Sequence, residues 1–263
     1  MTVTTEAAVE VATDVAPSPS ATGSAWHLLI TPAIIVAAGI ALFVGVRAAE
    51  PNESELRSLE ASFVLRLLGQ HISLAAVSSV IVLAVAIPVG IALSRKGARL
   101  VTPAILGIAN IGQGAPAIGV IVILAVILPT AAPFWVAILA LSLYSVLPAL
   151  RNTMVGLQQV DPALVEAGRG IGMSATRTLL TVELPLAAPI MLAGIRTTLV
   201  LNVGVAALAA FIGAGGLGEM IAAGVKLQQN VVLITGSVLI AMLALGIDWL
   251  GALAERYLRP KGV

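Results

Sequence analysis

The chain has 263 residues, of which 59% are hydrophobic and 10% are charged, and its formal net charge is +1. Soluble domains carry about 25% charged residues, so this composition predicts an integral membrane protein. The small net charge and the 3% aromatic content argue against a nucleic-acid-binding surface. Because the chain has no cysteine, disulfides, thiolate metal sites and cysteine nucleophiles are excluded.

Residues 1–25 are polar, acidic and rich in Ala, Thr, Ser and Pro, which predicts a disordered tail. They lack the positively charged start of a signal peptide, and the apolar run that follows is long enough to span a bilayer. We therefore expect residues 28–48 to be a retained helix. Cleavage after the small residues at the end of this run stays an alternative.

Six apolar stretches are long enough to cross a bilayer. A spanning helix needs roughly 20 apolar residues, because the hydrocarbon core is about 30 Å thick and a helix rises about 1.5 Å per residue. The predicted spans are 28–48, 71–94, 101–128, 133–150, 188–212 and 230–253. The third contains the run NIGQGAP, whose glycines and Pro116 predict a broken or kinked helix.

Basic residues are concentrated in the connections on one side of these spans. If the connection at 161–185 is cytoplasmic, the basic residues on its side are Arg95, Lys96, Arg99, Arg151, Arg169, Arg177, Arg256, Arg259 and Lys261. The other side holds Arg47, Arg57, Arg66 and Lys226, together with Glu50, Glu53, Glu55 and Glu60. The bias predicts that both termini are cytoplasmic. The tail at 1–25 fits this rule least well, because it has no Lys or Arg to hold it there.

The stretch DPALVEAGRGIGMSATRTLLTVELP, residues 161–185, is polar and able to form helices. Asp161 before Pro162 predicts a helix start. Glycines at 170 and 172 interrupt this helix, Ser174 can cap a second one, and Pro185 is expected to end it. From the residues alone, a docking element for a cytoplasmic partner and an ordinary connecting loop are equally good interpretations.

The same stretch resembles the EAA signature of ABC importer permeases. Its spacing is matched by Glu166-Ala167-Gly168, then Gly172, then Val182, and finally Leu184-Pro185. Gly168 stands where the signature has alanine, and Val182 where it has isoleucine. In that family the segment is a coupling helix that docks on an ATPase, which implies a coupling role for Asp161, Glu166, Ala167, Gly168, Gly172, Leu184 and Pro185.

A wider resemblance covers about residues 70–260. The runs LPALRNTMVGLQQVDPALVEAGRGIGMS, VELPLAAPIMLAGIRT and LAAFIGAGGLGEMI are similar to permeases of osmoprotectant importers, which carry glycine betaine, choline, carnitine or proline betaine. The resemblance implies an all-α, polytopic fold: the five-helix core of a type I (MetI-like) ABC importer permease with one extra N-terminal transmembrane helix. It also implies location in the bacterial inner membrane.

This comparison divides the chain into four parts. They are a disordered cytoplasmic tail (1–25), an extra transmembrane helix with an acidic outer loop (26–69), the permease domain (70–255) and a basic cytoplasmic tail (256–263). The implied partners are ABC ATPase subunits, a second permease subunit in a homo- or heterodimer, and an extracytoplasmic substrate-binding protein. ATP and magnesium would bind the ATPase, so no cofactor and no metal is expected in this chain.

Arg196 and Asp248 are the clearest cases of charged residues inside predicted spans, where a charge at the centre costs roughly 2.5 to 3.5 kcal/mol on insertion scales. We expect Arg196 and Asp248 to form an intramembrane ion pair. The alternative is that each side chain reaches separately to the membrane interface.

Several uncharged groups are candidates for the translocation path or its gate. They are Asn110, Gln113, Pro116, Asn202, Gly213, Gly215 and Gly216. For the amides, hydrogen bonding between helices is the alternative to a role in the path. The glycines follow a span and not a strand, so they form no dinucleotide fingerprint and predict a flexible outer turn. His71 is expected at a membrane boundary.

These observations predict a permease that works by alternating access without bond chemistry of its own. Its few aromatic residues are scattered and predict no cage for a quaternary ammonium, so selection would rest on the binding protein. The alternatives are an importer for another small solute such as an amino acid, an ATP-independent secondary transporter, and a membrane scaffold that transports nothing.

Overall fold

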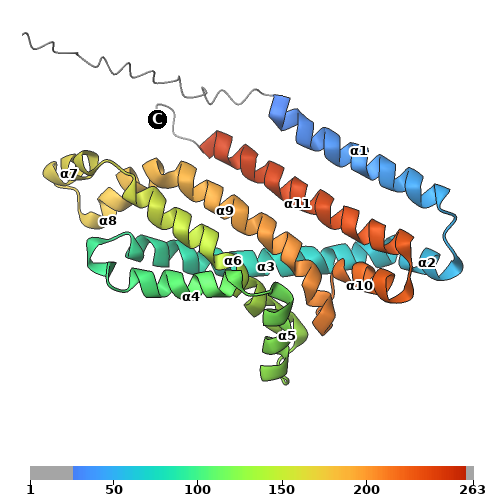
Figure 1. Ribbon diagram of the computed structural model, residues 1–263. Coiled ribbons are helices and arrows are strands. Elements are labelled where there is room, and N and C mark those ends of the chain that lie inside the picture. Colours follow the sequence, from blue (N-terminus) through green and yellow to red (C-terminus); the bar gives the residue numbers. More distant parts are fainter. Residues whose placement is uncertain (1–25, 259–263) are drawn as a thin grey trace, which may run out of the picture.

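The computed structural model describes residues 26–258, and every regular element in this range is helical (Figure 1). The long helices are α1 (Trp26–Ala48), α3 (Ala61–Leu93), α6 (Pro133–Gln158), α9 (Leu184–Ala206) and α11 (Asn230–Leu258). The shorter ones are α2 (Glu53–Ser58), α4 (Thr102–Gly114), α5 (Ala117–Ile127), α7 (Pro162–Gly170), α8 (Ala175–Thr178) and α10 (Gly218–Leu227). Tighter or wider turns extend them: the 3₁₀ turns η1 (Lys96–Ala98) and η3 (Ala207–Ile212), and the π turn η2 (Leu179–Glu183).

Five helical segments of residues 26–258 are long and apolar enough to cross a membrane, and α4 with α5 makes a sixth if the two count as one broken span. The six predicted spans correspond to these. The largest differences are at two helices, which are longer than predicted: α3 begins at Ala61 and not at residue 71, and α6 continues to Gln158 and not only to residue 150. Hydropathy marks only the part of a helix inside the bilayer, whereas the 33 residues of α3 extend about 50 Å.

The predicted boundaries near the two ends of the chain are less well matched. The boundary between 69 and 70 falls inside α3, and residues 256–258 of the predicted basic tail form the last turn of α11. The rest of that tail and the predicted disordered tail at 1–25 lie outside the described residues.

A short helix, α2, takes the place of the predicted acidic loop. Asn52 Oδ1 accepts hydrogen bonds from the amides of Ser54 and Glu55, both at 3.0 Å, and Glu55 Oε2 accepts from the Asn52 amide at 3.0 Å. This capping box is visible in the sequence as Asn52 followed three residues later by Glu55. Gln229 Nε2 donates to Ser54 Oγ at 2.8 Å and ties α2 to the turn before α11.

Helices α3, α6 and α9 pack on one another and form the centre of the bundle, with α11 against α9. Leu74, Leu141 and Ala206 belong to the core where the three central helices meet. The close approach of α3 to α6 depends on Gly90, because a Cβ there would lie 2.7 Å from Thr153 Cβ. Small residues at helix contacts are the usual means of packing in a membrane.

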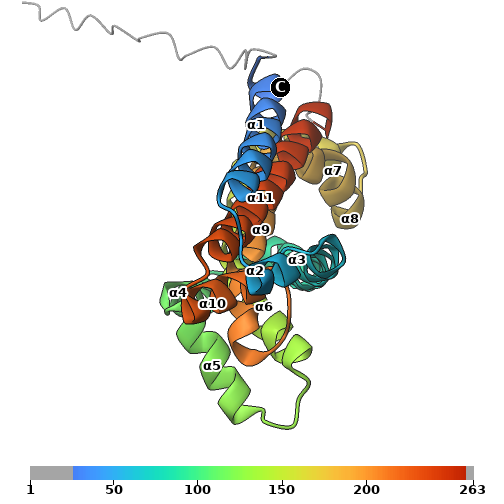
Figure 2. The same cartoon turned by 90° about the vertical axis from the view of Figure 1, so that its right-hand side faces the viewer.

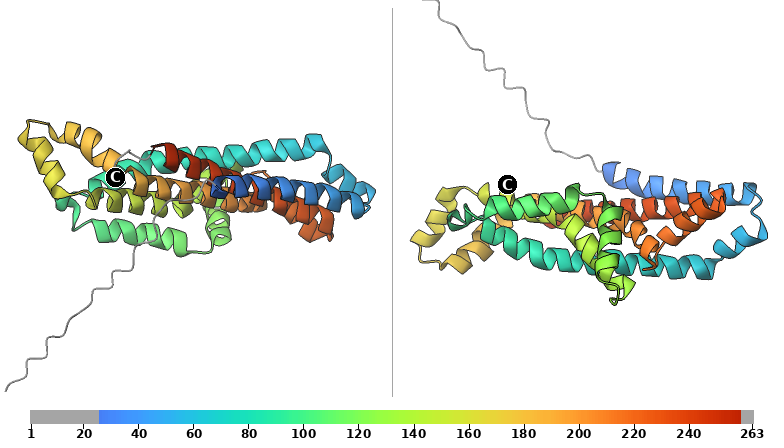
Figure 3. Two further views of the ribbon diagram at one scale, coloured as in Figure 1. Left: turned by 90° about the horizontal axis from the view of Figure 1, so that it is seen from above. Right: turned by 60° about the horizontal axis from the view of Figure 1, so that its bottom comes forward.

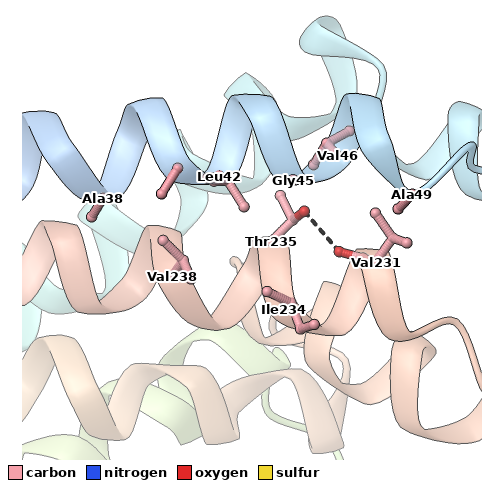
Figure 4. A pocket seen from close by; sticks show the side chains of 10 residues that line it. Ala38, Leu42, Gly45, Val46, Ala49, Val231, Ile234, Thr235 and Val238 are labelled. Carbon is pink, nitrogen blue, oxygen red and sulfur yellow. Dashed lines mark hydrogen bonds between the residues drawn. The ribbon is translucent and has the colours of Figure 1, made fainter.

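Helix α1 lies at the edge of the bundle, where it packs against the outer side of α11 (Figures 1 and 2). Its apolar side chains, such as Phe43 at 61% exposure, face outward as expected for a lipid-facing helix. An apolar cleft of about 340 Å³ lies along the contact between the two helices, with Leu42 and Val46 on one wall and Val238 on the other (Figure 4).

Helices α4 and α5, called here the bent pair, meet at an angle of 99°. The break falls at Ala115 and Pro116, where the chain leaves the helical conformation and Pro116 precedes the first turn of α5. Figure 3 shows α5, in light green, turned across the direction of α4. The predicted break in the third span is therefore confirmed, because proline disfavours helical conformation in the residue before it.

Candidate functional site

The coupling segment, residues 161–185, stands at one end of the bundle, called here the coupling end (Figure 1). Helix α7 begins at Asp161, whose Oδ1 accepts a hydrogen bond from the Ala163 amide at 2.8 Å. The chain then turns at Gly172, whose φ of +88° lies in the left-handed region that favours glycine. Ser174 Oγ accepts from the Arg177 amide at 3.3 Å and caps α8. The two predicted helix starts and the glycine turn between them are confirmed.

The coupling segment presents both polar and apolar groups to its surroundings. Glu166 and Ala167 are exposed on α7, whereas Gly168 is buried. A Cβ at Gly168 would lie 3.5 Å from Met173 Sδ and 3.6 Å from Thr178 Cγ2, which is ordinary contact. The site therefore has room for the alanine of the EAA signature.

The expectation that Pro185 ends a helix is wrong. Residues 175–212 form one helical run, in which Pro185 occupies the first turn of α9. The preceding residues form a π turn, where the Leu184 amide donates to the Leu179 carbonyl five residues back. Proline lacks an amide hydrogen and crowds the preceding turn of a regular helix, and the wider π turn accommodates it. The end of the coupling segment is thus continuous with a spanning helix.

An ion pair connects the coupling segment to the end of α3. Arg95 Nη1 lies 2.7 Å from Glu183 Oε2, and the Glu183 side chain is only 4% exposed. The other carboxylate oxygen, Oε1, is buried without a hydrogen-bond partner. A buried carboxylate depends strongly on its counter-ion. The pair therefore holds the π turn against α3, and the sequence analysis missed it because 88 residues separate the partners.

A cavity of about 1010 Å³ lies at the coupling end between the α3–α4 connection and α7. Apolar side chains from α3, α4 and α6 form one part of its wall. Lys96, Arg99 and Arg169 form the other part, together with Glu166 and the Arg95–Glu183 pair. We call it the basic cavity. In residues 26–258, Lys96, Arg99 and Arg169 form no ion pair within 4.0 Å.

Three of the predicted pathway residues lie on the bent pair. Asn110 is exposed, and its Nδ2 donates to the Leu106 carbonyl of its own helix at 2.7 Å. Gln113 is half-buried in the last turn of α4, and Pro116 is exposed at the break. The bend therefore carries polar groups within an otherwise apolar, exposed surface.

Asn202 lies elsewhere, in the interior between α3 and α9. It is fully buried, and its Nδ2 donates to Ser79 Oγ at 2.8 Å. In this conformation Asn202 therefore forms a hydrogen bond between helices, which was the alternative to a role in the path. His71 is also buried and donates from Nε2 to the Val203 carbonyl at 2.9 Å. The ten residues of α3 before His71 extend the helix beyond the predicted span, and the expected position of His71 at a membrane boundary stays a prediction.

Gly213, Gly215 and Gly216 form the turn between η3 and α10, all with positive φ. The Gly216 amide donates to Gln70 Oε1 at 3.1 Å, and a Cβ at Gly216 would lie 3.2 Å from His71 Nδ1. The turn is therefore packed on α3, in contrast to the flexible turn that was predicted.

The structure brings Arg196 and Asp248 together across α9 and α11. Arg196 donates from Nε and Nη2 to the two carboxylate oxygens of Asp248, each at 2.6 Å, and its Nη1 lies 3.5 Å from Glu255 Oε2. Gly251 makes room for this arginine, because a Cβ there would lie 2.8 Å from Arg196 Cγ. The sequence analysis missed Glu255, although it stands two helical turns after Asp248 on the same face.

Comparison with known proteins gives this geometry its family context. A family model described as "Binding-protein-dependent transport system inner membrane component" matches residues 86–260. The chain is 44% identical over 197 residues to the choline transport system permease protein OpuBB of Bacillus subtilis (strain 168), which covers 74% of this chain and 88% of the relative. It is 38% identical over 206 residues to the osmoprotectant import permease protein OsmW of Salmonella typhimurium, which covers 77% of this chain and 95% of the relative.

The fold has a match among solved structures. A chain of the MetNI methionine ABC transporter in an inward-facing conformation superimposes with a TM-score of 0.66 and 25% sequence identity. The match covers 80% of this chain and 100% of the other. It confirms the predicted five-helix core with an added N-terminal helix.

Proposed function

The chain belongs to the family of binding-protein-dependent transport system inner membrane components, and we propose that it is the permease subunit of an ATP-driven ABC importer for osmoprotectants. Its solutes are quaternary ammonium compounds such as glycine betaine, choline, carnitine and proline betaine. The observation that carries this proposal is the identity to choline and osmoprotectant permeases, which extends over nearly the whole length of those relatives.

In this proposal the coupling segment docks on an ATPase that binds ATP and magnesium. Exposed Glu166 and Ala167 on α7 offer the contact surface, and Gly172 sets the angle between α7 and α8. Motion of the ATPase passes through the π turn into α9, because the helical run from 175 to 212 is continuous. The Arg95–Glu183 pair transmits the same motion to α3.

Two permease subunits enclose the path and alternate between outward-facing and inward-facing states. The bent pair contributes its polar groups to this path, and the turn at 213–218 lies at the end that receives the binding protein. The basic residues at the coupling end favour a cytoplasmic location for it and for both termini. The permease passes its solute on with low affinity, because its few aromatic residues leave high-affinity selection to the binding protein.

Ion-coupled secondary transport is the weaker alternative. Transporters of that class need ionisable groups in the membrane that can gain and lose a cation. Glu183, Asp248 and Glu255 are the carboxylates in the spanning segments that the structure describes, and each has an arginine partner. This arrangement favours an external energy source.

The test is uptake of labelled choline, glycine betaine and methionine into proteoliposomes that contain the chain with its ATPase and binding protein. We expect uptake of choline or glycine betaine that requires ATP inside the vesicles, and no uptake of methionine. Uptake of methionine alone would assign the chain to another solute class. Uptake that persists without ATP would contradict the whole assignment.

A further inference from the structure

The basic cavity at the coupling end has a charge that the described residues leave unbalanced. Arg95 is paired with Glu183, so Lys96, Arg99 and Arg169 face a single further carboxylate, that of Glu166. The three cations are exposed in the cavity wall and have no ion-pair partner in residues 26–258. Helices α4 and α7 also begin at this cavity, and the start of a helix favours negative charge. The cavity is therefore suited to an acidic occupant.

The chain itself contains a segment of the matching charge. Residues 1–25 include Glu6, Glu10 and Asp14 and no Lys or Arg. The acids are therefore the only charged side chains of this segment, and its side-chain charge is opposite to that of the basic cavity. The other end of the chain does not qualify, because residues 259–263 contain Arg259 and Lys261 and no acid.

The start of α1 lies on the correct side of the bundle for this segment. Helix α1 runs antiparallel to α11, so its first residue lies toward the end where α11 finishes, which is also the end that carries α7 (Figures 1 and 3). Twenty-five residues reach up to about 80 Å when extended. Packed helices lie about 10 Å apart, so this length is sufficient to cross the end of the bundle.

We propose that residues 1–25 dock in the basic cavity, with Glu6, Glu10 and Asp14 against Lys96, Arg99 and Arg169. The N-terminal tail has no basic residue of its own, and the docking keeps it on the coupling side of the membrane. It also places the tail beside Glu166, at the surface that the coupling segment offers to a partner. The proposal does not depend on which solute is carried.

The absence of cysteine allows a direct test by crosslinking. One cysteine is introduced between the acids as Ala12→Cys, and a second in the cavity wall as Thr102→Cys. The matched control pairs Ala12→Cys with Tyr257→Cys, which is exposed in the last turn of α11 and outside the cavity. The full chain with its partner subunits is reconstituted in vesicles that contain phosphatidylglycerol, and a bismaleimide crosslinker is added.

We expect crosslinking to Thr102→Cys to be at least about tenfold faster than to Tyr257→Cys, because docking raises the local concentration. The preference should fall when salt is raised from about 0.05 M to about 0.5 M, since exposed charges are then screened. It should also disappear in the Glu6→Gln, Glu10→Gln, Asp14→Asn variant, because the three substitutions remove the acidic charge and lie outside the described bundle.

Equal crosslinking at the two sites, or a preference that survives removal of the three acids, would overturn the proposal. The same crosslinking is repeated in vesicles of pure phosphatidylcholine, which have no anionic headgroups. A preference for Thr102→Cys that appears only in these vesicles would also overturn the proposal, because phosphatidylglycerol headgroups would then occupy the cavity in a charged membrane. The crosslink forms within this chain and does not require transport. The docking proposal can therefore be tested even if the chain takes up no betaine.

Discussion

Gly168 and Gly172 stand four residues apart in the coupling segment, but the structure requires glycine only at the second. Gly172 has a φ of +88°, which an L side chain adopts with strain, whereas a Cβ at Gly168 would make ordinary contacts. Glycine inside a helix costs stability relative to alanine. Gly168, where the EAA signature has alanine, therefore lowers the stability of α7, and no close contact in the structure requires glycine there.

We predict that Gly168→Ala raises the stability of the chain by up to about 1 kcal/mol. The matched variant Gly172→Ala should lower it by about 1 to 2 kcal/mol, because alanine is strained in the left-handed region. Thermal unfolding of the two purified variants checks the contrast. Equal shifts for both, or destabilisation by Gly168→Ala, would show that the geometry of α7 is described wrongly.

At the scale of elements, α9 and α11 are held together by a half-buried charge contact as well as by apolar packing. Arg196 donates two hydrogen bonds to Asp248 and also lies near Glu255. Loss of the arginine leaves two carboxylates without their partner, whereas loss of Asp248 leaves the arginine with Glu255. The two single variants should therefore differ in severity.

We predict that Arg196→Gln destabilises the chain by about 2 kcal/mol and Asp248→Asn by about 1 kcal/mol, less than for a fully buried pair because both side chains are partly exposed. The exchange variant Arg196→Asp with Asp248→Arg should recover part of the loss, because the pair can form in the opposite sense. Unfolding in detergent measures all three. Two equal single losses with no recovery in the exchange variant would mean that each side chain reaches the membrane interface separately.

Some features of these elements could be predicted from the local sequence, and others could not. Hydropathy located the spans, and the caps at Asp161 and Ser174 were visible because capping is a local pattern. The π turn before Pro185 could not be anticipated, since it depends on how α9 continues the coupling segment. The start of α3 was missed because the helix continues, past Arg66 and Gln70, beyond the part that hydropathy marks.

At the scale of the whole molecule, the contacts that unite distant segments were the hardest to predict. Arg95 and Glu183 are 88 residues apart, and Ser79 and Asn202 are 123 apart. Nothing in the local pattern of either pair points to the other. The Arg196–Asp248 pair could be anticipated because charges inside spans are few and costly, which leaves few choices of partner. The resemblance to a family led to the proposed coupling role, and the structure shows the contacts that connect this segment to α3 and α9.

The proposed role of the coupling segment is to receive motion driven by ATP. It is tested most directly by uptake of labelled choline or glycine betaine in proteoliposomes with Glu166→Arg. The matched control is Glu53→Arg, the same charge change at an exposed glutamate in the first turn of α2. Thermal unfolding of both variants first establishes that they are folded.

We predict that Glu166→Arg loses at least about tenfold of the ATP-dependent uptake, because the change reverses a charge at the proposed docking surface, where mismatched charge costs several kcal/mol. Glu53→Arg should keep uptake within about twofold of the wild type, because an exposed charge away from that surface contributes little. Full uptake by a folded Glu166→Arg variant would contradict the account, because the polar segment would then be an ordinary connecting loop.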